Sequence, residues 1–555
     1  MKMISNRFLF IFLILFCVSI FTELTSQESD YYYLREKLDS LQAVKYNKLN
    51  IVEEKLNSLL TNSFSKEDER LTLSKRELLS GVFYKLAFLY HEFEEYKELK
   101  DYEEIDFLRR QFVSNEIDSE EYLFKIGNIL NNKHITIEDD PLELYTPSYG
   151  KSISLYNKII DEYNGSDYFE DAIFNKGFIL YENLKQKESS LEFFDKIITN
   201  YKKSKYYSVS NFIIGEYYFD PERNPDNNVV QDSILVNKSL KYYRAVIECA
   251  DIDYDYYFKA LYRVGFAYYR LYDYEKSAFY MTKTIEEINL KFGEVSDVEK
   301  RAMVNLCLDY LAFSYRDRPW QNEYDAVTAL KNHILDRKNS GNSTLYTYGN
   351  KLLERLGYIY NQGDDYDLAI TALDTLLSMY PTDYNAPETQ QKIIEISEIK
   401  TYKNDEDRFN SLALEREQLF FKYNSSSSWR NSVQDKSDNV DSLISENMLI
   451  NINEYQVKAQ NTGDKNLYEK TVELIDHYLS SLPEDDDFYR LKWYKASILG
   501  NQLNDYKSAF DIFINLSNDS KTSNYEDSLS GSQFDSKKAA LSAIIMAQKI
   551  KETEK

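Results

Sequence analysis

The sequence predicts an all-α fold in which antiparallel helix hairpins stack into a right-handed α-α superhelix. Six times a small residue is followed four positions later by a bulky apolar one, at intervals of 38 to 49 residues. These pairs, with a seventh further along, are Ser152/Tyr156, Ser190/Phe194, Ser239/Tyr243, Ser277/Met281, Ala326/Leu330, Ala369/Leu373 and Ala509/Phe513. Gly (15) and Pro (8) are scarce among 555 residues, so helix interiors are rarely interrupted. Such self-similarity is typical of a repeat array whose units contact only their neighbours.

A second small residue precedes several of these pairs by a constant 12 positions. The offset joins Gly265 to Ser277, Gly357 to Ala369 and Ser497 to Ala509, while the large Phe178 stands 12 positions before Ser190. Small residues on both helices of a hairpin let the two backbones approach closely, and bulky side chains then fill the space between hairpins. The offset therefore indicates one structural unit repeated along the chain.

The best-formed unit, residues 348–381, resembles the tetratricopeptide repeat. It carries Leu356-Gly357-x-x-Tyr360, then Ala369, and ends at Pro381. The resemblance extends over roughly residues 75–550 and implies a tetratricopeptide solenoid. The sequence of the region around 212–278 resembles those of bacterial periplasmic tetratricopeptide proteins of the envelope, such as CpoB and BamD. That similarity implies a scaffold role.

The expected organisation has five parts. Residues 1–26 form a signal peptide, 27–73 an N-terminal helical segment, 74–423 the solenoid, 424–440 a Ser-rich linker, and 441–555 a C-terminal tetratricopeptide-like segment that ends in a capping helix. Three polar stretches, near 220–237, 425–440 and 517–533, are expected to be irregular because Asn, Asp, Ser, Gly and Pro gather there.

The first residues have the pattern of a secretory signal peptide. Lys2 and Arg7 precede an unbroken apolar run of 14 residues, and a polar segment follows. Cleavage is expected after Ser26, and the chain is expected to be periplasmic or secreted. Peripheral association with the outer membrane stays open, because Cys17 would anchor the chain if it were lipidated.

No residue pattern indicates catalysis, a metal or a cofactor. The formal charge is −25, which disfavours nucleic acid as a partner. The four histidines lie outside zinc motifs, and no nucleophile or phosphate-binding motif is present. Oxygen-bearing residues alternate between Asp220 and Asn228, but the Gly of a calcium loop is missing, so a solvated loop is the expectation. Cys249 and Cys307 are expected to stay unpaired.

The resemblance implies that first-helix side chains line a concave groove. The residues at those positions, which we take as the candidate partner-binding set, are Phe212, Glu216, Phe219, Tyr262, Phe266, Tyr269, Arg270, Tyr358 and Asn361. Clusters of aromatic residues and Arg are typical of binding hot spots. The same aromatic side chains could instead pack against a curved neighbour. Tyr268, by contrast, is expected to be buried between helices.

The function predicted first is a non-enzymatic tetratricopeptide scaffold that binds a protein or peptide partner at the cell envelope. Two alternatives stay open. One is a glycan-binding outer-membrane protein of the SusD type, also built on tetratricopeptide helices. The other is a superhelical cell-wall enzyme such as a lytic transglycosylase, which would need a separate catalytic domain.

Overall fold

The chain forms two compact units, residues 1–260 and residues 261–555. The computed structural model describes residues 73–131, 133, 135–249, 253–293, 298–321, 325–433, 437–482, 486–519, 525–526, 533–534 and 536–554, with 44, 48, 51–55 and 58. The expected signal peptide and Cys17 lie outside these residues, as does most of the N-terminal segment 27–73. Within the described ranges, no helix is both long and apolar enough to cross a bilayer.

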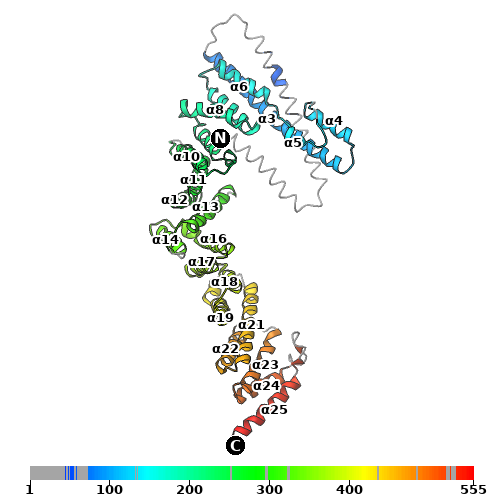
Figure 1. Ribbon diagram of the computed structural model, residues 1–555, viewed down its shortest axis with the longest axis vertical. Coiled ribbons are helices and arrows are strands. Elements are labelled where there is room, and N and C mark those ends of the chain that lie inside the picture. Colours follow the sequence, from blue (N-terminus) through cyan, green and yellow to red (C-terminus); the bar gives the residue numbers. More distant parts are fainter. Residues whose placement is uncertain are drawn as a thin grey trace. The chain divides into compact units, whose positions relative to one another are not determined.

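The first unit is built from helices that pack in sequence order, as Figure 1 shows. Its helices are α3 (Leu73–Val113), α4 (Ser119–Ile129), α5 (Pro141–Leu144), α6 (Gly150–Glu162), α7 (Phe169–Phe178), the π-helix η1 (Ile179–Asn183), α8 (Lys187–Asn200), α9 (Tyr207–Phe219), the 3-10 turn η2 (Pro221–Arg223) and α10 (Val229–Ile247). The main hairpins are α3 with α6, α7 with α8, and α9 with α10.

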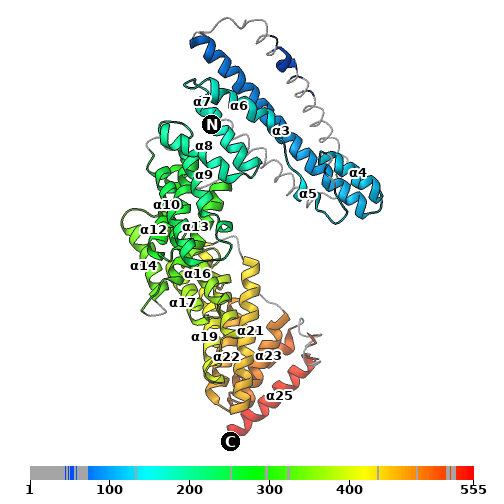
Figure 2. The same cartoon turned by 45° about the horizontal axis from the view of Figure 1, so that its top comes forward.

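The second unit repeats this arrangement, and Figure 2 shows its helices following one another down to α25. Its elements are the second part of α11 (Tyr254–Arg270), α12 (Tyr274–Phe292), α13 (Val298–Asp317), α14 (Asp325–Asn339), α15 (Thr344–Thr347), α16 (Gly349–Gln362), α17 (Tyr366–Met379), α18 (Ala386–Ile399), α19 (Asp405–Tyr423), α20 (Ser428–Ser432), α21 (Ser437–Thr462), α22 (Lys465–Ser481), α23 (Asp486–Asn501), α24 (Tyr506–Asn518), β1 (Tyr525–Glu526), β2 (Gln533–Phe534) and α25 (Ser536–Thr553).

The predicted all-α fold of helix hairpins is confirmed, and the recurring pairs form its core. Both members of all seven small/bulky pairs are buried. In four of the pairs the bulky member packs on a glycine of the preceding helix: a Cβ added to Gly215 would lie 2.6 Å from the Tyr243 ring, and one added to Gly357 would lie 3.0 Å from Leu373. The close approach of two helices, expected from the spacing, is therefore present, and the pairs mark the second helix of each hairpin.

The hairpin of α7 and α8 corrects one detail of the spacing. The small residue that packs against Phe194 is Gly177, 13 positions before Ser190, and Phe178 stands beside it. The extra residue is absorbed by η1, because a π-helix inserts one residue into an α-helical turn. The unit therefore keeps its packing although its sequence offset differs.

The first hairpin contains a large insertion that the repeat pattern does not predict. Helix α3 runs for 41 residues and pairs with α6, while α4 and α5 lie between them in the sequence. Ala87 and Tyr90 of α3 are buried. The second half of α3 forms a separate small core with α4 around Ile105 and Ile126.

Two of the three stretches expected to be irregular are shorter than predicted, and most of the third, near 517–533, lies outside the described residues. In the first, α10 begins at Val229, so only the segment between α9 and α10 is a loop with one 3-10 turn. In the second, α20 places Trp429 in the core with 2% of its surface exposed. In the third, β1 and β2 pair as a two-residue antiparallel ladder, which departs from an all-helical expectation.

Cys249 and Cys307 are not paired with each other. Cys307 is fully buried, as expected, whereas Cys249 is only half-buried. Burial raises the pKa of the Cys307 thiol far above its usual range, so this thiol stays protonated and unreactive.

Candidate partner-binding surface

In the first unit, the predicted residues Phe212, Glu216 and Phe219 gather around Tyr243 of α10. The Tyr243 ring lies 5.6 Å from the Phe212 ring and 6.0 Å from the Phe219 ring. Its hydroxyl donates a hydrogen bond of 2.5 Å to Glu216 Oε1. Phe219 is buried. Contrary to the prediction of an exposed groove position, Phe219 packs inside the hairpin, and its two companions also hold Tyr243 in place.

In the second unit, Tyr262, Phe266 and Tyr269 of α11 lie together on one side of the helix, as predicted. All three are half-buried. Their rings meet Tyr310 of α13 at centroid distances of 6.3, 4.5 and 5.3 Å, respectively. Phe313 of α13 extends the group, 5.9 Å from Tyr310. We call these five aromatic side chains the aromatic surface; each is partly buried by the others and partly open to solvent.

A charged edge borders the aromatic surface at the end of α13. The Tyr269 hydroxyl donates to Asp317 Oδ2 at 2.5 Å, and the Arg316 guanidinium donates to the same carboxylate. Burial, reinforced by the Asp317 carboxylate, raises the pKa of Tyr269 above its usual range, so its hydroxyl stays a donor. Arg316 also lies 5.0 Å from the Phe313 ring. Arg270 follows Tyr269 on α11 and is half-buried.

Helix α16 continues the same face. Arg355 donates from Nε to Asp309 Oδ1 and from Nη2 to Asn305 Oδ1 of α13. Tyr358 follows Arg355 by almost one turn and is 63% exposed. Asn361 is half-buried, and its Oδ1 has no hydrogen-bond partner among the described residues. The predicted pair on α16 therefore differs: Tyr358 exposes its ring, whereas Asn361 Oδ1 is buried.

Tyr268 is placed as predicted, away from the aromatic surface. It is 6% exposed and stacks on Tyr280 of α12 at 5.6 Å. Adjacent residues of one helix point about 100° apart, so Tyr268 and Tyr269 serve different faces of α11. Tyr268 stabilises its hairpin, and Tyr269 links two successive first helices.

The sequence reasoning missed the contribution of α13. The repeat positions that line the groove on α11 can also be counted along α13. They correspond there to Leu306, Asp309, Phe313, Arg316 and Asp317. Tyr310, which touches three α11 rings, falls outside those positions. Its role depends on the approach of α11 and α13, a long-range contact that spacing within one hairpin does not encode.

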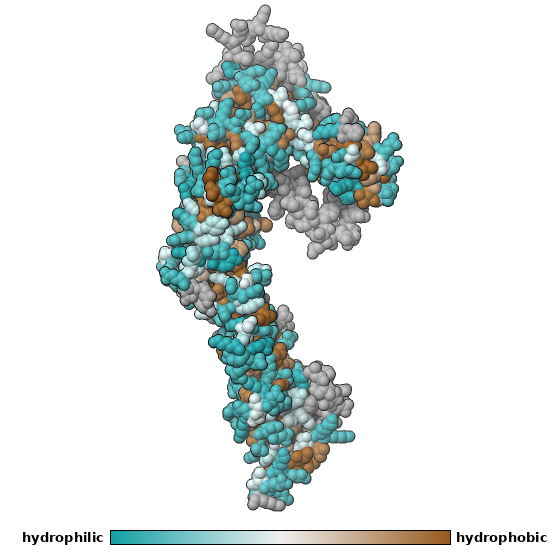
Figure 3. All heavy atoms as spheres, in the orientation of Figure 1, coloured by the Kyte–Doolittle hydropathy of each residue, from teal (hydrophilic) through white to brown (hydrophobic). Residues whose placement is uncertain are grey.

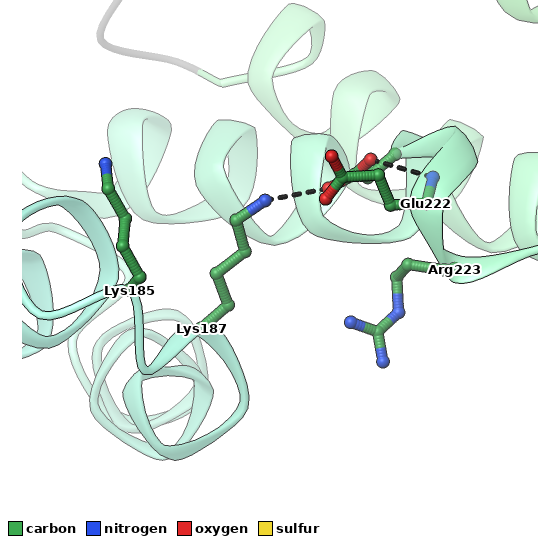
Figure 4. Close-up of a pocket in the computed structure, with 5 residues that line it drawn as sticks. Lys185, Lys187, Glu222 and Arg223 are labelled. Carbon is green, nitrogen blue, oxygen red and sulfur yellow. Dashed lines mark hydrogen bonds and ion pairs between the residues drawn. The ribbon is translucent and has the colours of Figure 1, made fainter. Parts of the chain in front are cut away.

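The loop between α9 and α10, in the first unit, borders an open cleft of about 450 Å³ lined by Lys185, Lys187, Asp220, Glu222 and Arg223. Lys187 and Asp220 form an ion pair of 2.7 Å, and Figure 4 shows Lys185, Lys187, Glu222 and Arg223 around the cleft. Arg223 pairs with Glu188 at 3.0 Å. The cleft therefore holds charges that largely neutralise one another.

The oxygen atoms of this loop serve as helix caps. The Asp220 carboxylate accepts from the amide of Glu222, and the Asn228 side chain accepts from the amides of Val230 and Gln231 at the start of α10. Over the described ranges, no group of three or more His, Cys, Asp or Glu side chains is arranged to hold a metal ion. These residues act as a capped turn, in agreement with the solvated-loop expectation.

Comparison with known proteins identifies the repeat. The tetratricopeptide repeat family matches residues 171–204 and 352–383, which cover the hairpins of α7 with α8 and α16 with α17. A structure of a monomeric IFIT1 mutant with m7Gppp-AAAA is similar over 78% of this chain and 89% of that chain, at 12% identity and a TM-score of 0.17. No curated protein matches the sequence. The chain thus contains tetratricopeptide repeats, and together with the helix pairing this establishes the all-α repeat fold.

Proposed function

We propose that this tetratricopeptide-repeat chain is a non-enzymatic scaffold that binds a protein or peptide partner through the aromatic surface and the adjoining face of α16. Tetratricopeptide repeats generally bind protein partners, which supports the broad function. The observation that carries the finer proposal is the cluster of five half-buried rings on α11 and α13, with Arg316 over the Phe313 ring. Helix α16 adds Arg355, which is paired with Asp309 of α13, and the exposed ring of Tyr358.

The chemistry of this face suits an extended or helical peptide with apolar side chains. Partly buried aromatic rings are rigid, so a partner can pack against them with little loss of side-chain entropy. Arg316 and Arg355 are already paired with Asp317 and Asp309, so they offer hydrogen-bond donors without an uncompensated charge. The net charge of −25 disfavours a strongly acidic partner.

The binding proposal can be tested with a phage-displayed peptide library selected on the purified chain. Tyr358→Ala removes an exposed ring and should leave stability unchanged, yet should weaken the selected peptides about 10- to 100-fold, the effect of a hot-spot residue. Phe279→Ala is the matched control, because Phe279 is 60% exposed on α12, a second helix. Equal affinities of the Tyr358→Ala and natural chains, or equal weakening by both variants, would contradict binding at this face.

We further propose that the chain acts in the cell envelope as a periplasmic or secreted protein. The proposal rests on the basic start and the apolar run of the first 26 residues. It predicts that the exported chain begins at Gln27, which N-terminal sequencing of protein recovered from the envelope fraction would check. A chain that still begins at Met1 would contradict the envelope location, whereas a lipidated Cys17 would contradict only the start at Gln27 and would leave the envelope location in place.

A further inference from the structure

Helix α25 has two faces of different chemistry. One face packs into the core of the second unit through Ala539, Ala543 and Met546, all of which are buried. The Met546 sulfur fills the space beside Gly500 of α23, since a Cβ added there would lie 2.5 Å from it. The helix is therefore firmly docked, and its other face is held outward.

The outward face carries an apolar stripe. Leu541, Ile544 and Ile545 are 59%, 56% and 43% exposed, and at about 100° per residue they spread over about 100° of the helix surface, with Leu541 between the directions of the two isoleucines. In Figure 3 brown side chains gather over α25. Their exposure shows that no described element of the chain covers them. Exposing three neighbouring large aliphatic side chains to water is unfavourable in free energy, which indicates that another surface covers them.

Two charged residues at the ends of the same face are placed so that they would be complementary to those of a second copy of the helix. Lys537 and Glu552 lie at equal distances from the midpoint between Ile544 and Ile545. At about 100° per residue, both fall within the width of the stripe, at its opposite ends. Both are exposed, and neither forms an ion pair or a hydrogen bond with a described residue. Two antiparallel copies of α25 would thus bring Lys537 of each copy against Glu552 of the other, with the isoleucines of both copies at the centre.

We propose that two copies of this chain associate through α25, in an antiparallel and two-fold symmetric pairing. A two-fold interface uses the same patch on both subunits, so it requires a self-complementary surface. The stripe meets that requirement in its apolar centre and in its charged ends. The interface contributes only three aliphatic side chains from each copy, well below the size of an obligate dimer interface, so association should be reversible and concentration-dependent.

Sedimentation equilibrium of the purified chain over a wide concentration range tests the proposal. The natural chain should shift from its monomer mass toward twice that mass at high concentration. Ile544→Glu should weaken the dimer at least tenfold. Leu290→Glu is the matched control, because it introduces the same charge at an 83% exposed aliphatic position on α12 and should leave the dimer intact. A natural chain that stays monomeric throughout, or a dimer that survives Ile544→Glu, would overturn the proposal.

Charge exchange tests the antiparallel register. Lys537→Glu and Glu552→Lys each place like charges opposite one another, and each should weaken the dimer, while the double variant should restore it. An equimolar mixture of the two single variants should associate as well, because opposite charges then meet at both ends. Equal circular dichroism spectra would show that the variants are folded. If the double variant fails to recover the dimer, the proposed register is wrong.

Discussion

Trp429 should stabilise the Ser-rich segment near residues 425–440, which the sequence predicts to be irregular. Its ring is 2% exposed and lies edge-on to Tyr423 at 5.4 Å. Its indole N–H donates to the backbone oxygen of Asp383, 46 residues earlier, at 2.7 Å. The backbone N–H of Arg430 is capped by Ser427, the residue before α20. The Ser-rich segment is therefore anchored to the α17–α18 turn through one side chain.

The expected effect of Trp429→Ala follows from these contacts. Loss of a fully buried aromatic side chain with the cavity it leaves costs about 3–5 kcal/mol, and loss of the hydrogen bond adds about 1 kcal/mol. Trp429→Phe keeps most of the ring and loses the hydrogen bond, so it should cost about 1–2 kcal/mol. Ser428→Ala, at an exposed neighbouring position, should change stability by less than about 0.5 kcal/mol.

Amide hydrogen exchange is the suitable assay, because a repeat array opens locally and a global melting curve averages over all units. Each 1.4 kcal/mol is a tenfold change, so Trp429→Ala should lower protection of the α19 and α20 amides about 1,000- to 10,000-fold and open the segment to trypsin at Arg430. Protection that is equally low in the natural chain would refute the anchoring role. So would protection that Trp429→Ala leaves unchanged.

Three further predictions concern packing, thiol chemistry and pH. Gly215→Ala should destabilise the chain by about 1–3 kcal/mol in urea unfolding, because its new methyl meets the Tyr243 ring at 2.6 Å. The control is Gly127→Ala in α4, where the new methyl would lie 3.9 Å from the Lys133 backbone oxygen; it should stabilise the chain by up to about 1 kcal/mol. In a thiol titration of the folded chain, the buried Cys307 should not react until urea unfolds the protein, and reaction at the rate of a free thiol would contradict its burial. Burial, with the nearby carboxylate of α17, raises the pKa of Glu415 above its ordinary 4.5. The folded chain then holds this proton more tightly than the unfolded chain, so the contribution of Glu415 to stability is present at low pH and is lost as the pH rises through the raised pKa. Glu415→Gln should flatten that loss in urea unfolding measured between pH 4 and 7, and an unaltered pH profile would contradict the assignment.

Part of the candidate site could be predicted from the sequence because helix geometry is local. Tyr268 and Tyr269 are neighbours, yet the repeat spacing correctly assigned Tyr268 to the core. The same spacing placed Phe219 in a groove, although the structure buries it against Tyr243. Spacing defines the direction of a side chain on its helix, but it does not show how closely the next helix approaches. That distance depends on side chains contributed by other segments.

The expected contrast among the α11 tyrosines also needs revision. The sequence placed Tyr269 in the candidate partner-binding set and Tyr268 between helices. In the structure its hydroxyl bonds to Asp317 and its ring packs on Tyr310, so its replacement by Ala should weaken folding as well as binding. Tyr358 is the cleaner probe of binding, because its ring is mostly exposed.

The sequence by itself determined the repeat, its small and bulky positions and therefore the all-α fold, since these depend on residues a few positions apart within one hairpin. Tertiary structure alone decided which aromatic side chains meet. Tyr310 joins the α11 rings, Trp429 reaches Asp383, and a π-helix absorbs the extra residue after Gly177. The first two are contacts between segments whose separation is set by the packing of whole helices, and the π-helix lets Gly177 keep its packing against Phe194. Periodicity carries no information about such distances, because the same pattern of small and bulky residues is compatible with several ways of seating one hairpin on the next.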